Sequence, residues 1–192
     1  MGRSCQLCLR LDRDITMARA VYPYTGWVAN AVRAHKYAEE WDRGADLAAR
    51  MAPIVREFGS LDAIVPVPLH PQKARRRGFN QAELLARGIS KSLGLPVLPL
   101  LARSRETRPQ VGLGREERLA NVRDAFALDP ARVPAPGGRF LLVDDVRTTG
   151  ATLSACAKVL TTTGPAAIYV ATFALDIPES MLRPWLDELA LA

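Results

Sequence analysis

Residues 139–160, RFLLVDDVRTTGATLSACAKVL, carry the clearest signal of secondary structure in the chain. Its apolar run over 140–146 is typical of a buried parallel strand, which ends in two adjacent carboxylates, Asp144 and Asp145. A turn rich in threonine and glycine follows. Helical spacing then runs from about 149 to 163, with Cys156 on the apolar face as a small buried hydrophobe. The stretch therefore predicts a strand, turn and helix unit of an α/β protein.

Segments on both sides extend this alternation. Upstream, apolar periodicity predicts two helices over 26–58 that are broken near Tyr37, a buried strand over 62–69, a helix over 79–94 that Gly94 ends, and a strand at about 97–102. Downstream, the Pro- and Gly-rich segment 130–138 is interpreted as a loop, and 166–175 as a final strand. Such alternation predicts a parallel sheet covered by helices on both faces.

The composition bounds the class of protein. With 192 residues, 48% of them hydrophobic, the chain can bury one sizeable core. Lys and Arg outnumber Asp and Glu by 26 to 20, and the formal charge of +6 favours an anionic partner such as phosphate or nucleic acid. Three scattered cysteines argue for a reducing, cytoplasmic compartment. No apolar run approaches the roughly 18 residues of a membrane span, so no membrane insertion is expected.

The turn after Asp144 and Asp145 has the features of a phosphate cradle. In parallel α/β sheets, ligands bind beyond the carboxyl ends of the strands, which is where this turn is expected. Its backbone N–H groups and hydroxyls can converge on an anion, and its glycine allows the backbone to approach closely. The cradle comprises Thr148, Thr149, Gly150, Ala151 and Thr152.

The neighbouring acids indicate what the cradle holds. No Gly-Lys-Ser/Thr follows the turn and no GxGxxG occurs in the chain, which argues against nucleoside triphosphates and dinucleotides. A phosphate about one helical turn from two carboxylates fits a sugar phosphate such as ribose 5-phosphate, whose vicinal hydroxyls would donate hydrogen bonds to the acids. The alternative is that Asp144 and Asp145 only cap the next helix and interact with its dipole.

A second candidate site is the basic run KARRR at 73–77. Taken alone it is most often a solvated face, but after a strand end it can clamp a polyanion through Lys73, Arg76 and Arg77, or contact nucleic acid. His70 is a candidate phosphate contact, although a histidine after a strand is more often a structural hydrogen-bond partner. Aromatic residues are only 6% of the chain and only Phe79 lies among these arginines, so base stacking is expected to contribute little.

The motifs resemble those of a known family. LLVDDVRTTGAT (141–152) looks like the signature with which type I phosphoribosyltransferases bind 5-phosphoribosyl 1-diphosphate (PRPP). Further blocks resemble the ComF competence-protein family within that superfamily: YTGWVANAVRAHKY (24–37), IVPVPLHPQKARRRGFNQAELLA (64–86) and RPQVGLGREERLANVRDAF (108–126). The resemblance implies the type I phosphoribosyltransferase fold, a Rossmann-like parallel sheet flanked by helices.

The same resemblance implies a role for each part of the site. Asp144 and Asp145 would hold the ribose hydroxyls and contact Mg²⁺ directly or through water, and the cradle 148–152 would hold the 5′-phosphate. The loop after Val67 would hold the pyrophosphate. Its contacts would be Pro68, Leu69, His70, Lys73, Arg76 and Arg77.

Two further features follow from the family pattern. The long charged segment 103–118 would close over the site as a flap, with Arg105, Arg108 and Arg115 reaching the diphosphate. Arg147 stands where the superfamily usually carries an apolar or aromatic residue. It either adds a phosphate contact or points to solvent.

The N-terminus departs from the family. Members often begin with two Cys-x-x-Cys pairs, whereas this chain has only CQLC at 5–8. Cys5 and Cys8 are half of a tetrahedral zinc site, so zinc is not expected in this chain alone. The module is either truncated or completed by another chain, which leaves a homodimer open. We therefore predict a truncated Cys-containing segment over 1–25 and a phosphoribosyltransferase-like domain over 26–192.

Two functions of different classes follow. The first is an enzyme that binds PRPP, transfers its phosphoribosyl group and releases pyrophosphate. The second is a non-catalytic competence or DNA-uptake factor that binds single-stranded DNA, with PRPP as a regulator. Neither the N-terminal segment nor the tail after Asp176 shows a base-binding pattern, so the sequence does not identify the phosphoribosyl acceptor.

Overall fold

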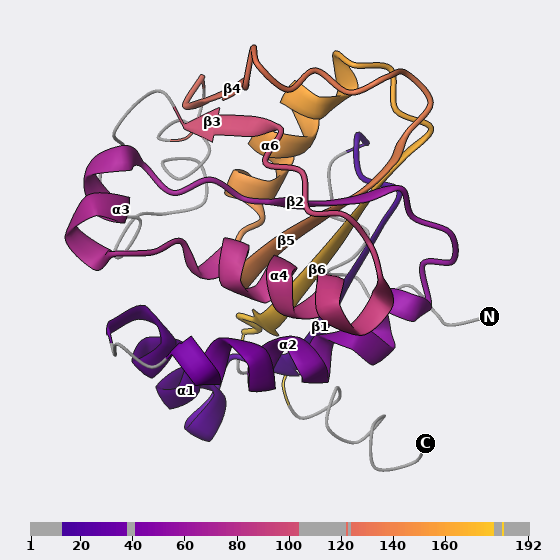
Figure 1. Ribbon diagram of the computed structural model, residues 1–192. Coiled ribbons are helices and arrows are strands. Elements are labelled where there is room, and N and C mark those ends of the chain that lie inside the picture. Colours follow the sequence, from indigo (N-terminus) through magenta and orange to yellow (C-terminus); the bar gives the residue numbers. More distant parts are fainter. Residues whose placement is uncertain (1–12, 38–40, 104–121, 123, 179–181, 183–192) are drawn as a thin grey trace.

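The computed structural model describes residues 13–37, 41–103, 122, 124–178 and 182. Parallel strands form its main sheet in the order β1-β6-β5-β2 (Figure 1). The strands are β1 (Met17–Pro23), β2 (Ala63–Pro66), β5 (Arg139–Arg147) and β6 (Ala167–Leu175). β5 and β6 occupy the centre and are buried along most of their length, as their continuous apolar runs require.

One face of the sheet is covered by three helices. They are α1 (Gly26–Tyr37), α2 (Trp41–Arg56) and α4 (Gln81–Leu93). Their apolar stripes pack against alternate residues of β5 and β6, so that Met51 and Leu85 join Leu141 in one core cluster. No helix in the described ranges is both long enough and apolar enough to cross a membrane.

The opposite face is covered by α6 (Ala151–Thr161) and by an antiparallel ribbon (Figure 1). The ribbon consists of β3 (Leu101–Arg103) and β4 (Phe126–Leu128). Leu153 of α6 and Phe126 of β4 join Leu142 of β5 in the second core cluster. With both faces covered, the predicted α/β class and the parallel sheet flanked by helices are confirmed.

The sequence periodicity also placed several element ends well. α1 ends at Tyr37, near the predicted break, and α2 begins at Trp41. Gly94 ends α4 in the left-handed conformation, where its N–H donates to the Ser90 carbonyl at 2.8 Å. The strand expected at 97–102 is shorter and later, at Leu101–Arg103, although Val97 forms an isolated parallel bridge with Ile64.

The predicted domain boundary after residue 25 is too late. β1 lies inside the range 1–25, which was predicted to be a truncated Cys-containing segment outside the main domain, yet it pairs with β6 from Met17 to Pro23. Its sequence, MARAVYP, has no continuous apolar run, because Arg19 interrupts it. The main domain therefore includes residues N-terminal to 26.

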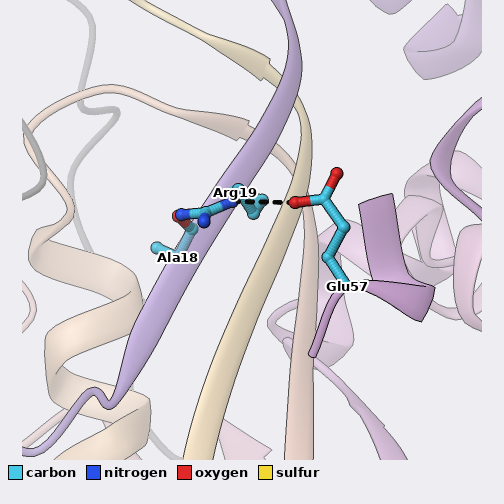
Figure 2. Close-up of polar contacts among 3 residues, drawn as sticks. All are labelled: Ala18, Arg19 and Glu57. Atoms are coloured by element: carbon cyan, nitrogen blue, oxygen red, sulfur yellow. Dashed lines mark hydrogen bonds and ion pairs between the residues drawn. The ribbon is translucent and has the colours of Figure 1, made fainter. Parts of the chain in front are cut away.

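Arg19 is accommodated at the surface of this edge strand (Figure 2). Its Nε lies 3.3 Å from Glu57 Oε2, just beyond α2, and its Nη1 donates to the Ala18 carbonyl at 3.2 Å. Since both side chains are partly exposed, the ion pair contributes at most about 1 kcal/mol. The charge of Arg19 therefore costs β1 little stability.

Helices α2 and α4 cross so closely that position 88 has no room for a side chain. A Cβ built on Gly88 would lie 2.3 Å from the Cβ of Ala48, far inside the normal contact distance. Ala48 is fully buried. The crossing fixes α4 on the sheet, and the residue before α4, Asn80, donates to the Val67 carbonyl beyond β2 at 3.0 Å.

Gly88→Ala should therefore destabilise the protein by about 1–3 kcal/mol, because the added methyl overlaps Ala48 and its neighbours must shift. Helix propensity alone predicts the opposite sign, because alanine in place of glycine inside a helix raises the free energy of unfolding by about 1 kcal/mol. Urea unfolding measures the difference. The double variant Ala48→Gly/Gly88→Ala moves the methyl from α2 to α4 and should recover most of the loss. A Gly88→Ala protein as stable as the wild type would contradict the close crossing.

Candidate functional site

The two adjacent acids lie at the carboxyl end of β5, as predicted. Asp145 is buried, with 8% of its surface exposed, and Asp144 is half-buried. Each Oδ1 accepts a hydrogen bond from the next backbone N–H, at 2.9 Å for Asp144 and 2.7 Å for Asp145. Both carboxylates are thereby held in fixed orientations at the strand end.

Strand alternation sends these carboxylates to opposite faces of the sheet. Asp144 follows Leu142 toward the face covered by α6 and the β3–β4 ribbon, and Asp145 follows Val143 toward the face covered by α1, α2 and α4. A ligand that contacts both must therefore sit beyond the strand end, across the edge of the sheet. This is the position in which parallel α/β sheets bind their ligands.

The surroundings of Asp144 are buried and charged. Burial raises the pKa of the Cys156 thiol well above its usual value; the Asp144 carboxylate raises it further and Arg103 lowers it. Burial also lowers the pKa of the Arg103 guanidinium, while Cys156 and Asp144 raise it. Arg103 stacks its guanidinium over the Phe126 ring, 5.2 Å from the centroid. The expectation that Cys156 is a small buried side chain is confirmed, because none of its surface is exposed.

The cradle forms the wall of a hollow beside Asp144. The hollow is shallow and open to solvent, and its lining residues are Asp144, Val146, Arg147, Thr148, Gly150, Ala151, Thr152 and Leu153. Gly150 adopts φ +81° as the N-cap of α6 and no side chain caps it. Thr149 Oγ1 accepts a long hydrogen bond, 3.4 Å, from the Ala151 N–H. The start of α6 therefore faces the hollow with glycine where other helices carry a capping side chain.

Arg147 does not point to solvent. Only 6% of its surface is exposed, and its Nη1 is buried without a hydrogen-bond partner in the structure. A buried guanidinium N–H that lacks an acceptor is costly, so this group is suited to an anion. Of the alternatives that the sequence left open for Arg147, the solvent position is thus eliminated.

The loop after β2 lies along the same edge of the sheet. Val67 donates its N–H to the Val143 carbonyl at 3.0 Å, which ties the loop to β5, and Pro68, Leu69 and His70 are partly buried. His70 Nδ1 accepts from the Gln72 N–H at 3.3 Å and so caps the next helix. The structural role favoured for His70 is confirmed by this bond.

The basic run folds as a helix that sequence reasoning did not predict. This helix, α3 (Pro71–Arg77), has no buried residue and ends at Gly78 with φ +82°. Arg75 and Arg76 are exposed, whereas Lys73 and Arg77 are partly covered. The segment lacks the apolar periodicity by which helices are recognised, but Pro71 at its first position and a capping residue before it are start signals.

Some candidate residues lie outside the described part of the chain. They are Arg105, Arg108 and Arg115 of the flap segment, and Cys5 and Cys8 of the N-terminal pair. Their assigned roles remain predictions.

Two buried polar residues near the site were not predicted from the sequence. Thr172 on β6 pairs in register with Asp144 and is 1% exposed, and its Oγ1 has no hydrogen-bond partner. Gln81, in the first turn of α4, is 4% exposed, with Nε2 also unpartnered. Thr172 had a detectable signal, as the one aliphatic hydroxyl in the run AIYVATFAL.

The chain is similar in sequence to proteins that are named for competence or DNA utilization. The chain is 39% identical over 125 residues to competence protein F of Haemophilus influenzae, covering 65% of this chain and 55% of that protein. DNA utilization protein YhgH of Escherichia coli is 38% identical over 110 residues, covering 57% and 47%. Competence protein ComFC of Streptococcus pneumoniae is 29% identical over 173 residues, covering 90% and 73%. The chain thus spans about half the length of the first two relatives.

Solved structures resemble the chain more distantly. Glutamine PRPP amidotransferase from B. subtilis aligns with 73% of this chain and 30% of its own, at a TM-score of 0.48 and 16% identity. A likeness this distant says nothing about activity. No family model matches the chain. The sequence relatives, which include competence protein F and ComFC, nevertheless bear out the resemblance of the motif blocks to ComF competence proteins.

Proposed function

We propose that the carboxyl edge of the sheet binds PRPP together with Mg²⁺. The observation that carries this proposal is the junction of β5 and α6. There a pair of oriented carboxylates, Asp144 and Asp145, is followed directly by a hollow at an uncapped helix N-terminus. Carboxylates suit the ribose hydroxyls, and backbone N–H groups at a helix N-terminus suit a phosphate. Arg147, buried at the same junction, adds positive charge.

The donor set fits magnesium that is shared with its substrate. Mg²⁺ prefers oxygen ligands and is usually held by one or two carboxylates plus substrate phosphates and water. Asp144 and Asp145 supply carboxylates of this kind. Among the described residues no group of three or more Asp, Glu, His or Cys side chains could hold a metal alone. The remaining ligands would therefore come from PRPP and water.

In the catalytic form of this proposal, pyrophosphate leaves C1 of the ribose and an acceptor takes its place. Positive charge grows on the ribose ring as negative charge grows on the departing pyrophosphate. Asp144 and Asp145 keep the ribose ring in position and stabilise its positive charge. Lys73, Arg76 and Arg77 of α3 stabilise the negative charge of the pyrophosphate. Bound Mg²⁺ would neutralise part of the diphosphate charge. The acceptor is not identified by any described residue.

A second function is favoured by a separate observation. Helix α3 carries four basic residues in seven and buries none of its side chains, so it presents positive charge to solvent beside the proposed pyrophosphate site. Exposed basic residues bind phosphate backbones without sequence preference. Two of the sequence relatives are named for competence and for DNA utilization. We therefore propose that the same edge also binds single-stranded DNA, with PRPP as a regulator or competitor.

Mg²⁺ and PRPP together should raise the thermal stability of the chain. At PRPP concentrations about 100 times its Kd, binding adds about 2.7 kcal/mol to the free energy of unfolding. Asp144→Asn and Asp145→Asn should abolish most of this gain, as should EDTA, whereas Asp46→Asn, at an exposed position on α2, should retain it. Differential scanning fluorimetry measures the shift. A wild-type chain that ignores PRPP, or aspartate variants that respond normally, would contradict the proposed site.

DNA and PRPP should compete for the basic edge. If phosphates of the strand bind α3, the affinity for a labelled oligonucleotide falls with salt, and log K against log[salt] has a slope of about −0.7 for each phosphate neutralised. Fluorescence anisotropy should show weaker DNA binding with saturating Mg²⁺-PRPP and a shallower slope for Arg75→Gln/Arg76→Gln. Arg87→Gln, on the exposed side of α4, serves as the control. DNA affinity that is insensitive to PRPP would show that the sites are separate.

A further inference from the structure

An exposed tryptophan lies at the end of the edge strand, away from the proposed PRPP site. Trp27, in the first turn of α1, is 54% exposed. The other exposed large hydrophobic side chains of the described residues, Leu98 and Val133, are aliphatic. A single exposed aliphatic residue needs no explanation, but an indole is larger and has a flat face that stacks on other rings. Trp27 is therefore a candidate for stacking with a ligand.

The orientation of Trp27 is fixed by aromatic contacts that reach the core. Its ring meets Tyr22 of β1 edge to face, with centroids 5.1 Å apart and an interplanar angle of 69°. Tyr22 in turn meets Phe173 of β6 at 5.4 Å and 65°, and Phe173 is fully buried. A ring held in this way loses little conformational entropy when a ligand stacks on it.

A guanidinium lies over the same ring. Arg50 of α2 donates from Nη1 to the Tyr22 hydroxyl at 3.2 Å, and its Cζ lies 5.9 Å from the centroid of the Trp27 ring. Arg50 is exposed, so the rest of its fork faces solvent and can bind an anion. Tyr22, Trp27 and Arg50, which we call the aromatic platform, come from β1, α1 and α2.

We propose that the aromatic platform binds one nucleotide of a single-stranded DNA, with the base stacked on Trp27 and the adjoining phosphate on Arg50; this rests on the DNA-binding function proposed above. An exposed ring beside a positive charge is the combination with which proteins bind single strands independently of sequence. The platform also revises the expectation that base stacking contributes little. That expectation considered only aromatic residues near the basic run in sequence.

The position of the platform favours a base within a strand over a free base that accepts the phosphoribosyl group. In the order β1-β6-β5, the strand that carries Tyr22 is two neighbours from the strand that carries Asp144, a separation of roughly 10 Å at the usual spacing. Reacting atoms must approach to about 3–3.5 Å. A strand of DNA, by contrast, can extend across the sheet edge from α3 to the platform, since both follow carboxyl ends of strands.

The test compares a labelled oligothymidylate with an abasic oligonucleotide of the same length, using the full chain and fluorescence anisotropy. Trp27→Ala should weaken binding of the oligothymidylate by about 5- to 150-fold, the range of one base–aromatic stack, and leave binding of the abasic strand unchanged. Trp27→Phe should retain most of the affinity. Arg50→Gln should reduce the salt slope for both strands by about 0.7. Leu98→Ala and Val133→Ala are controls for loss of an exposed apolar side chain.

The outcomes separate this proposal from the function on which it rests. Wild-type protein that binds DNA with the same affinity as Trp27→Ala would overturn the platform and leave DNA binding intact. Wild-type protein that binds neither strand, even at low salt, would overturn both. Free thymine or adenine can be tested by quenching of the Trp27 fluorescence, with Trp27→Ala as the control that lacks this signal. Quenching by the free base that is absent in Trp27→Ala would show that the platform binds a small base, and would overturn the assignment to DNA. An unchanged thermal unfolding midpoint in Trp27→Ala shows that the variant is folded.

Discussion

Buried charge at the end of strand β5 is the feature that the surrounding structure has to compensate. β5 is covered on both faces, yet its last residues include Asp144, Asp145 and Arg147, of which the last two are buried. Burying an ionised group costs several kcal/mol unless it is hydrogen-bonded or paired. The carboxylates meet part of this requirement through the backbone N–H groups that follow them. The guanidinium of Arg147 keeps a buried Nη1 without an acceptor, which a bound phosphate would supply.

The rest of the fold places this strand end at an accessible edge. Parallel strands have their carboxyl ends at the same edge of the sheet. The loop after β2, the cradle and the first turn of α1 therefore lie along this edge. α6 starts at Gly150 within this edge, and Asn80 ties the start of α4 to the β2 loop. An anionic ligand held here would interact with helix N-termini, basic residues and oriented carboxylates together. PRPP, with a phosphate at one end and a diphosphate at the other, matches that distribution of charge.

Much of this arrangement was predictable from sequence, because long apolar runs and glycine caps are local signals. β5, α6, β6 and the position of Asp144 and Asp145 follow from such signals. β1 was missed because Arg19 interrupts its short run, and α3 because a helix that buries nothing has no apolar face to detect. The aromatic platform could not be found along the chain, since Tyr22, Trp27 and Arg50 meet only when β1, α1 and α2 pack together. The burial of Arg147 likewise depends on its tertiary environment.

A crystal structure of the chain grown with PRPP and Mg²⁺ would show whether the β5–α6 junction holds PRPP, as proposed. We expect ribose hydroxyls within about 2.5–3.0 Å of the carboxylates of Asp144 and Asp145, and the 5′-phosphate in the hollow lined by 148–152. PRPP bound at another surface, or a hollow that stays without ligand at saturating PRPP, would contradict a PRPP site at this junction.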